Sequence, residues 1–213
     1  MGQIARALSF SRRSIENPAT KLSDPAQWLV DWMTGGASKA GVTVSLQNAV
    51  RMTAFWCAVR VLSETVASLP LFIYERQEPR GRKRVRDHSL SEILHLQPNP
   101  RMTSLFFRET LQAQTVVHGN GYATIRRDQS GAIRELWPLT TQRVDPKLDG
   151  AGNLFYAIRL NDGRTERWAA EEMLHIPGLS FDGIKGKSVI SAARDAIGLG
   201  LAAQDYGSIF FGR

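Results

Sequence analysis

The clearest periodic pattern in the chain is an apolar stripe between residues 52 and 69. Its members are separated alternately by three and four positions: Met52, Phe55, Val59, Leu62, Val66 and Leu69. This spacing places them on one face of a helix, and it predicts a long helix that packs into the core. Ser45 is the candidate N-cap of this helix, and Pro70 ends it because proline disfavours helical geometry in the preceding residue.

Between residues 120 and 177 the pattern changes to short apolar runs separated by turn residues. The runs cover 122–127, 133–139, 154–160, 164–168 and 173–176, with a further strand position at Val144. The segments 128–131 (Asp-Gln-Ser-Gly) and 161–163 (Asn-Asp-Gly) are typical of hairpin turns. Strands that follow one another through tight turns indicate antiparallel pairing.

Two helices are predicted between the long helix and this strand region. The first follows Ser89, and the second is capped by Thr103 or Ser104 and stopped at Gly119. The second helix is expected to bury its apolar residues: Phe106, Phe107, Leu111, Ala113 and Val117. The segment 98–100 (Pro-Asn-Pro) separates the two helices.

A single C-terminal helix is predicted to begin at Ser188. Gly198 and Gly200 lie inside it and each cost about 1 kcal/mol relative to alanine, which indicates the close approach of another backbone. The predicted fold class is therefore α+β, with antiparallel strands and hairpins packed with a long N-terminal helix and a C-terminal helix. Residues 43–213 are assigned to this domain, and residues 1–42 to a basic, flexible N-terminal arm.

The chain of 213 residues carries 27 Lys and Arg against 20 Asp and Glu, which gives a net charge of +7 and favours contact with polyanions. The most basic stretch follows a predicted strand at 71–74 and contains one acid, Glu78. Its cations are Arg76, Arg80, Arg82, Lys83, Arg84 and Arg86. We expect a charged hairpin tip, which is either a solvated turn or a contact for phosphates or an acidic partner.

The sequence contains near misses to catalytic motifs. The glycine-rich segment 183–188 has Phe181 where a phosphate loop needs a glycine, and the segment 178–182 ends in Asp182 where a nucleophile elbow has a glycine. The histidines are too far apart in sequence for a typical zinc pair, and Cys57 is expected to be a structural thiol. No catalytic residue, metal or cofactor is therefore expected; a hydrolase using Ser180 with His175 is kept as an alternative.

Several short segments occur in a characteristic order. They are 67–71 (ASLPL), 98–100 (PNP), 118–123 (HGNGYA), 136–139 (LWPL), 173–176 (MLHI), 182–183 (DG) and 186–190 (GKSVI). With them the chain resembles the amino-terminal, wing-containing part of phage portal proteins of the HK97-like family, from about Val44 to the last residue. The family continues into stem, clip and crown segments, so the resemblance implies a chain truncated before them.

The resemblance implies a structural subunit of a ring, usually a dodecamer, at one capsid vertex. Double-stranded DNA is packaged and ejected through such a ring, which docks the terminase large subunit, neck or adaptor proteins and the major capsid protein. It implies a virion location, with host cytoplasm during assembly, and no membrane partner. No uninterrupted run of about 18 apolar residues occurs, so no membrane-spanning helix is expected.

Four aromatic residues are candidates for contacts between subunits: Trp28, Trp32, Phe210 and Phe211. The apolar stripe at 52–69 could also supply part of such a contact, with the chain's own core as the alternative. For Phe210 and Phe211 the resemblance also implies packing against the family segments that are missing here. The alternative for the whole chain is a stand-alone basic nucleic-acid-binding module. That alternative predicts a stable monomer that binds DNA without forming a ring.

Overall fold

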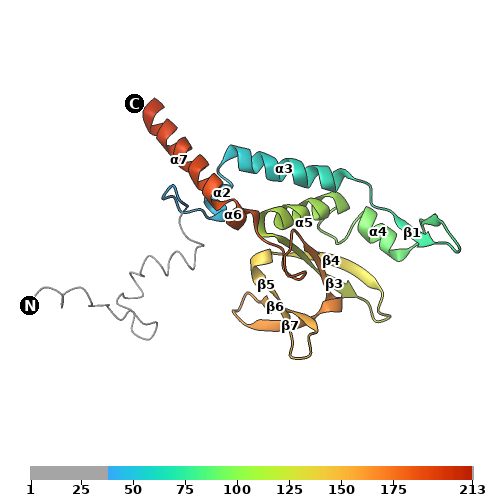
Figure 1. Cartoon of the computed structure of the whole chain (residues 1–213). Coiled ribbons are helices and arrows are strands. Elements are labelled where there is room, and N and C mark those ends of the chain that lie inside the picture. Colours follow the sequence, from blue (N-terminus) through green and yellow to red (C-terminus); the bar gives the residue numbers. More distant parts are fainter. Residues whose placement is uncertain (1–37, 213) are drawn as a thin grey trace, which may run out of the picture.

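The computed structural model describes residues 38–212, with helices along one side of the body and strands along the other (Figure 1). Helix α3 (Thr53–Ser68) lies beside α5 (Ser104–His118), and α5 covers the central strands. A two-stranded hairpin lies at one end of the body, and the C-terminal helix projects from the other end (Figure 1). The mixed helical and antiparallel architecture confirms the predicted α+β class.

The long helix begins later than its predicted cap. Ser45 caps a separate short helix, α2 (Leu46–Ala49), because its hydroxyl accepts from the backbone N–H of Asn48. The chain then turns, and α3 starts at Thr53 without a side-chain cap. Ala49 of α2 packs with Ile197 of the C-terminal helix, and Phe55 near the start of α3 joins this cluster, whereas the rest of α3 packs on α5.

The predicted apolar stripe of α3 is only partly buried. The buried side chains are Val59, Ser63 and Ala67, which follow each other at intervals of four. Small residues at this spacing allow α3 to lie close to α5. The larger stripe members are turned aside, so that Leu62 is 50% and Leu69 57% exposed. The prediction that the whole stripe faces the core of this chain was therefore wrong.

The segments between α3 and the sheets form the hairpin and the helices that the sequence predicts. Strands β1 (Ile73–Arg76) and β2 (Arg82–Val85) form an antiparallel hairpin, and α4 (Ser89–His95) follows it. Thr103 caps α5 by accepting from the N–H of Phe106, and Gly119 ends it with a φ of 84°. Within α5, Phe107 is buried as predicted, but Phe106 is exposed.

The remaining strands form two antiparallel three-stranded sheets. One has the order β4-β3-β8, from β3 (Asn120–Arg127), β4 (Ile133–Leu139) and β8 (Met173–Pro177). The other has the order β5-β6-β7, from β5 (Val144–Leu148), β6 (Leu154–Arg159) and β7 (Thr165–Ala169). Short 3₁₀ helices, η1 (Thr141–Arg143) and η2 (Ala170–Glu172), precede β5 and β8.

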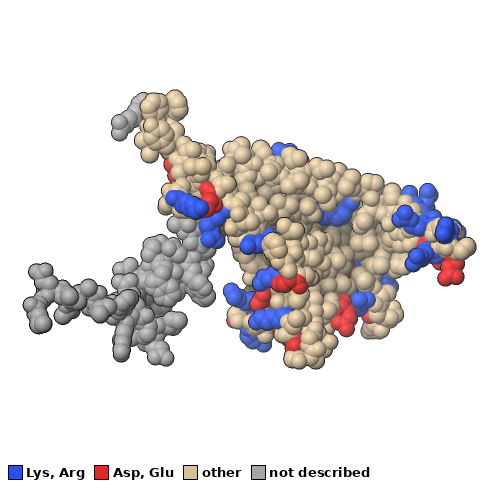
Figure 2. Space-filling model, viewed as in Figure 1, with Lys and Arg blue, Asp and Glu red and all other residues tan. Residues whose placement is uncertain are grey.

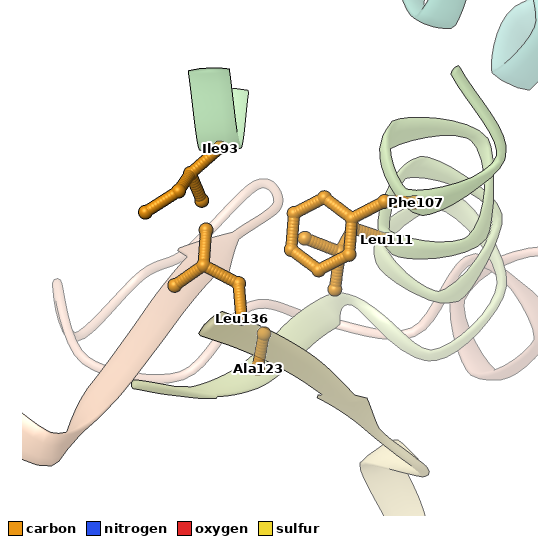
Figure 3. Packing of buried hydrophobic residues seen from close by; sticks show 5 residues of the cluster. All are labelled: Ile93, Phe107, Leu111, Ala123 and Leu136. Atoms are coloured by element: carbon orange, nitrogen blue, oxygen red, sulfur yellow. The ribbon is translucent and has the colours of Figure 1, made fainter. Parts of the chain in front are cut away.

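Strand β3 is shared by two hydrophobic clusters because successive side chains of a strand point to opposite faces. Ala123 faces α5 and α4, where Ile93, Phe107, Leu111 and Leu136 surround it (Figure 3). The adjacent Tyr122 faces the second sheet and joins the other cluster, with Val144, Tyr156, Ile158 and Met173. Helices α4 and α5 and both sheets are thus packed around one central strand, whereas α2 and α7 meet in a third cluster formed by Val44, Ala49 and Ile197.

The C-terminal helix is interrupted at Ala193, which separates α6 (Val189–Ala192) from α7 (Arg194–Phe211). The prediction of one continuous helix was therefore wrong, although Ser188 does cap its first turn. Gly198 and Gly200 of α7 have close neighbours, but these are side chains and not another backbone. A Cβ on Gly198 would lie 2.1 Å from the hydroxyl of Ser38, and one on Gly200 would lie 2.7 Å from the methyl group of Met52.

Candidate interaction surfaces

The predicted basic tip is the β1–β2 hairpin, which extends beyond α4 at one end of the body (Figures 1 and 2). Its strands pair from Ile73 opposite Val85 to Arg76 opposite Arg82. All the predicted cations are exposed: Arg76, Arg80, Arg82, Lys83, Arg84 and Arg86. Figure 2 shows Lys and Arg side chains gathered at this end of the molecule.

These cations lack the ion pairs that half of the other Lys and Arg side chains between residues 38 and 212 make. For example, Lys185 pairs with Asp145 at 2.9 Å and Arg134 with Asp128 at 2.7 Å. None of the six hairpin cations makes an ion pair with any residue between 38 and 212. Arg84 instead lies over the ring of Phe72, with its guanidinium carbon 3.5 Å from the ring centroid. The hairpin thus keeps its positive charge available for a partner.

A second surface is the apolar outer part of the helices. On α7, several large side chains are exposed: Leu199, Tyr206, Ile209, Phe210 and Phe211. Phe210 and Phe211 meet edge to face with centroids 5.1 Å apart, and Phe211 is 84% exposed. The other two predicted contact residues, Trp28 and Trp32, lie outside the described residues.

Helix α3 carries a further exposed apolar surface, which includes residues outside the predicted stripe. Trp56 and Val61 are exposed together with Leu62, Val66 and Leu69. Cys57 is exposed as well, so it does not pack as a core thiol. The only charged residues of α3 pair with each other, since Arg60 Nε lies 2.6 Å from Glu64. In Figure 2 the surface along α3 carries little charge.

A buried polar network holds the loop after β8 against β3. The side-chain amide of Asn120 donates to the Gly186 carbonyl at 2.9 Å, and its oxygen accepts from the Gly186 N–H at 2.8 Å. The same oxygen lies 3.0 Å from Nε2 of His175, so Nε2 carries the proton, and Nδ1 accepts from the Tyr156 hydroxyl at 3.2 Å. Burial lowers the pKa of His175, which favours this neutral form.

This network accounts for the residues that resembled a hydrolase. Both ring nitrogens of His175 are engaged with Tyr156 and Asn120, and the Ser180 hydroxyl bonds within its own loop to Asp182 at 2.9 Å. The two residues therefore lack the nucleophile–base hydrogen bond that acyl transfer needs. The Asp182 carboxylate accepts from the N–H groups of Lys185 and Ile184, which holds its pKa at about 2. Ser180 and Asp182 thus hold the conformation of the loop after β8.

The glycine-rich segment 183–188 likewise has a packing role. A Cβ on Gly186 would lie 1.8 Å from the carbonyl oxygen of Gly119, so only glycine fits where this loop crosses the end of α5. In the described part of the chain, no three His, Cys, Asp or Glu side chains gather to form a metal site. No helix between residues 38 and 212 has both the length and the apolarity needed to cross a membrane.

The comparison with known families decides the assignment. A family model described as phage portal protein matches residues 53–213. The chain belongs to this family. Three-quarters of the sequence is covered by the match, from the start of α3 to the end, so the same segments that build both sheets and the projecting helix are portal segments.

Two portal relatives have similar sequences over most of the chain. The portal protein of Enterobacteria phage HK97 is 29% identical over 170 residues, which are 79% of this chain and 40% of that protein. The probable portal protein of Streptomyces phage phiC31 is 33% identical over 186 residues, which are 83% of this chain and 40% of that protein. The chain thus spans 40% of the length of these relatives.

Solved structures share the fold of this chain. A chain in the neck of an empty gene transfer agent particle, computed with C6 symmetry, has a TM-score of 0.64 at 23% identity, covering 85% of this chain and 50% of that one. A chain in the neck of a native gene transfer agent particle, computed with C12 symmetry, has a TM-score of 0.62 at 20% identity, covering 88% of this chain and 50% of that one. At these identities the likeness supports the fold.

Sequence reasoning missed two features of this portal chain. It favoured the core over a subunit contact for the α3 stripe, although Ser63 and Ala67 already marked a second, small-residue face at intervals of four. It also gave Asn120 no role of its own, although Asn120 is 2% exposed and organises the polar network. No local pattern indicated the network, because Asn120 and Gly186 are 66 positions apart.

Proposed function

We propose that this chain is a wing-containing part of a portal subunit, which assembles into a ring at one capsid vertex. In this role the ring is the passage for double-stranded DNA during packaging and ejection. The packaging motor, or terminase large subunit, and the neck or adaptor proteins dock on it in turn, and the major capsid protein surrounds it. The subunit functions in the virion, after assembly in the host cytoplasm.

The observation that carries this proposal is the exposed apolar surface on α3 and α7. Monomeric soluble proteins rarely expose large contiguous apolar patches, and such patches mark protein interfaces. The surface on α3 includes Trp56 and Val61, and the surface on α7 ends in Phe210 and Phe211. These two surfaces lie on different elements, and contact between unlike surfaces of neighbouring copies generates a closed ring when the rotation closes.

The role is mechanical, without a reaction centre of its own. Among the described residues, the histidine and serine that resemble catalytic groups are engaged in structural hydrogen bonds. The shared central strand joins α5 and both sheets into one packed unit. The dodecamer is compatible with the symmetries named for two structural neighbours, which come from necks computed with C12 and with C6 symmetry. A stand-alone nucleic-acid-binding module would have no need for the apolar surfaces.

Sedimentation velocity over a range of micromolar concentrations tests the proposal. The chain is expected to form an assembly, and the double substitution Phe210→Ser with Phe211→Ser is expected to weaken it. Burying one phenylalanine contributes about 1.5–3 kcal/mol, so the loss of two amounts to a factor of about 100 or more in each contact.

The matched control is Leu148→Ser, because Leu148 is also exposed but lies at the end of β5. The control is expected to sediment like the unmodified chain. A chain that remains a monomer of 23.7 kDa at every concentration would overturn the proposal. Equal weakening by the control would show that the α7 surface has no special part in assembly.

A further inference from the structure

The strand register sorts the cations of the hairpin onto its two faces. Side chains alternate along a strand, and directly paired residues share a face. Arg76 is paired with Arg82, and Tyr74 with Arg84, so these four side chains belong to one face. Lys83 is paired with Glu75 on the opposite face. The charge of the hairpin is therefore one-sided, although the sequence shows only a mixed run of cations.

The same face is hollowed towards the turn. Tyr74, Arg76 and Arg82 line this hollow together with Arg80, which comes from the turn itself. Three guanidinium groups thus border one concave surface, and the fourth, Arg84, follows along β2. We call Arg76, Arg80, Arg82 and Arg84 the arginine face.

The arginine face is electrostatically unfavourable in the free chain. Like charges directly opposite each other destabilise a strand pair, and Arg76 and Arg82 are such a pair. No acid between residues 38 and 212 forms an ion pair with any member of this face. A bound polyanion would relieve this repulsion, since it supplies the missing negative charge.

We propose that the arginine face binds the backbone phosphates of double-stranded DNA. All four cations are arginines, whose planar fork of donors matches a phosphate in a bidentate manner. Alternate residues of a strand, such as Arg82 and Arg84, are about 7 Å apart, so each guanidinium can contact a separate phosphate. A two-stranded ribbon is also narrow enough to lie along a groove of DNA.

DNA fits this face better than an acidic protein does. The core of a protein interface is usually apolar and poor in charge, with a polar rim. The arginine face has the opposite composition, since it consists of cations and Tyr74 is the one large exposed apolar side chain on the same side of the hairpin. A contact made almost entirely by cations is typical of sequence-independent phosphate binding. This inference goes beyond the proposed function, because it assigns a partner to a surface separate from the apolar surfaces of α3 and α7.

The test is the salt dependence of binding to a labelled duplex of mixed sequence, measured by fluorescence anisotropy with the full chain. Each phosphate contact adds about 0.9 to the slope of log affinity against log salt concentration. The triple variant Arg76→Gln, Arg82→Gln, Arg84→Gln is therefore expected to lower the slope by about 2.7. Between 50 and 200 mM salt, the unmodified chain should lose about 40-fold more affinity than this variant does.

Two control variants test whether the change in slope is specific to the arginine face. Lys83→Gln removes a charge from the other side of the same hairpin, and is expected to leave the slope almost unchanged. The triple variant Arg126→Gln, Arg134→Gln, Arg164→Gln removes three charges that form local ion pairs elsewhere. Cations in the segment before residue 38 are the same in all proteins compared, so they cancel. The hairpin packs mainly on itself, so its variants are expected to keep the unmodified circular dichroism spectrum.

The proposal is overturned if the arginine-face variant and the triple control lower the slope equally. It is also overturned if the chain shows no binding to the duplex at 50 mM salt. Tighter binding to polyglutamate than to DNA of equal charge would assign the face to an acidic protein. Sedimentation under the same conditions shows whether the chain assembles, so failure to form rings and failure to bind DNA are distinguished.

Discussion

Replacing Asn120 by alanine is expected to destabilise the protein strongly, because its amide joins β3 to the loop after β8. Asn120 is 2% exposed and makes three side-chain hydrogen bonds, two with the Gly186 backbone and one with His175. Each hydrogen bond contributes about 1 kcal/mol net to the free energy of unfolding. Leaving the buried N–H of Gly186 without its partner costs a further 1–3 kcal/mol or so. The expected loss is therefore about 4–6 kcal/mol, a large part of the 5–15 kcal/mol or so that stabilises a typical domain.

Urea unfolding at pH 7, followed by tryptophan fluorescence, measures this loss. The same substitution at Asn153 is the matched control, because Asn153 is exposed and its side chain makes only a long hydrogen bond of 3.4 Å to Asp149. Surface substitutions of this kind usually change stability by about 0.5 kcal/mol or less. A loss below about 1 kcal/mol for Asn120→Ala, or equal losses for both variants, would refute the assigned role of the network.

Three further outcomes are expected. Gly186→Ala should destabilise the protein by more than about 2 kcal/mol in the same urea assay, since its Cβ would overlap the Gly119 carbonyl, while Gly150→Ala should be neutral because its Cβ meets open space. Burial lowers the pKa of His175, so the unfolded chain binds more protons below pH 6.5, and the free energy of unfolding should fall between pH 7.5 and 5.5; a rise would contradict this. Two backbone N–H groups hold the pKa of Asp182 at about 2, so its contribution to stability should be lost only as the pH falls from 3.8 to 2; an NMR titration midpoint near 4 would be inconsistent with that geometry.

Local chemistry was sufficient to predict the elements of the fold. The strand at Ile133–Leu139 has the predicted bounds, because a turn of Asp, Ser and Gly residues precedes it and an apolar run defines it. Thr103 and Gly119 mark the two ends of α5 as predicted, since caps depend on neighbouring residues alone. Antiparallel pairing followed from the short connections between strands.

The features that the sequence did not predict depend on contacts between residues that are far apart in the chain. The stripe of α3 has helical spacing whether it faces this chain's core or another molecule, so periodicity cannot distinguish the two. The interruption at Ala193 likewise depends on neighbours distant in sequence, because Ile197 packs with Val44 and Ala49. For the basic hairpin, composition identified the cations, but only the pairing of Arg76 with Arg82 showed that they share a face.

Electron microscopy of the purified chain tests the central claim most directly, because ring assembly is visible in single images. Closed rings of one size with a central opening are the expected result. Substitution of Phe210 and Phe211 by serine should reduce their number, since these side chains are exposed at the end of α7. Dispersed monomers at concentrations well above the micromolar range, or open filaments without a fixed number of subunits, would contradict the claim that this chain builds a portal ring.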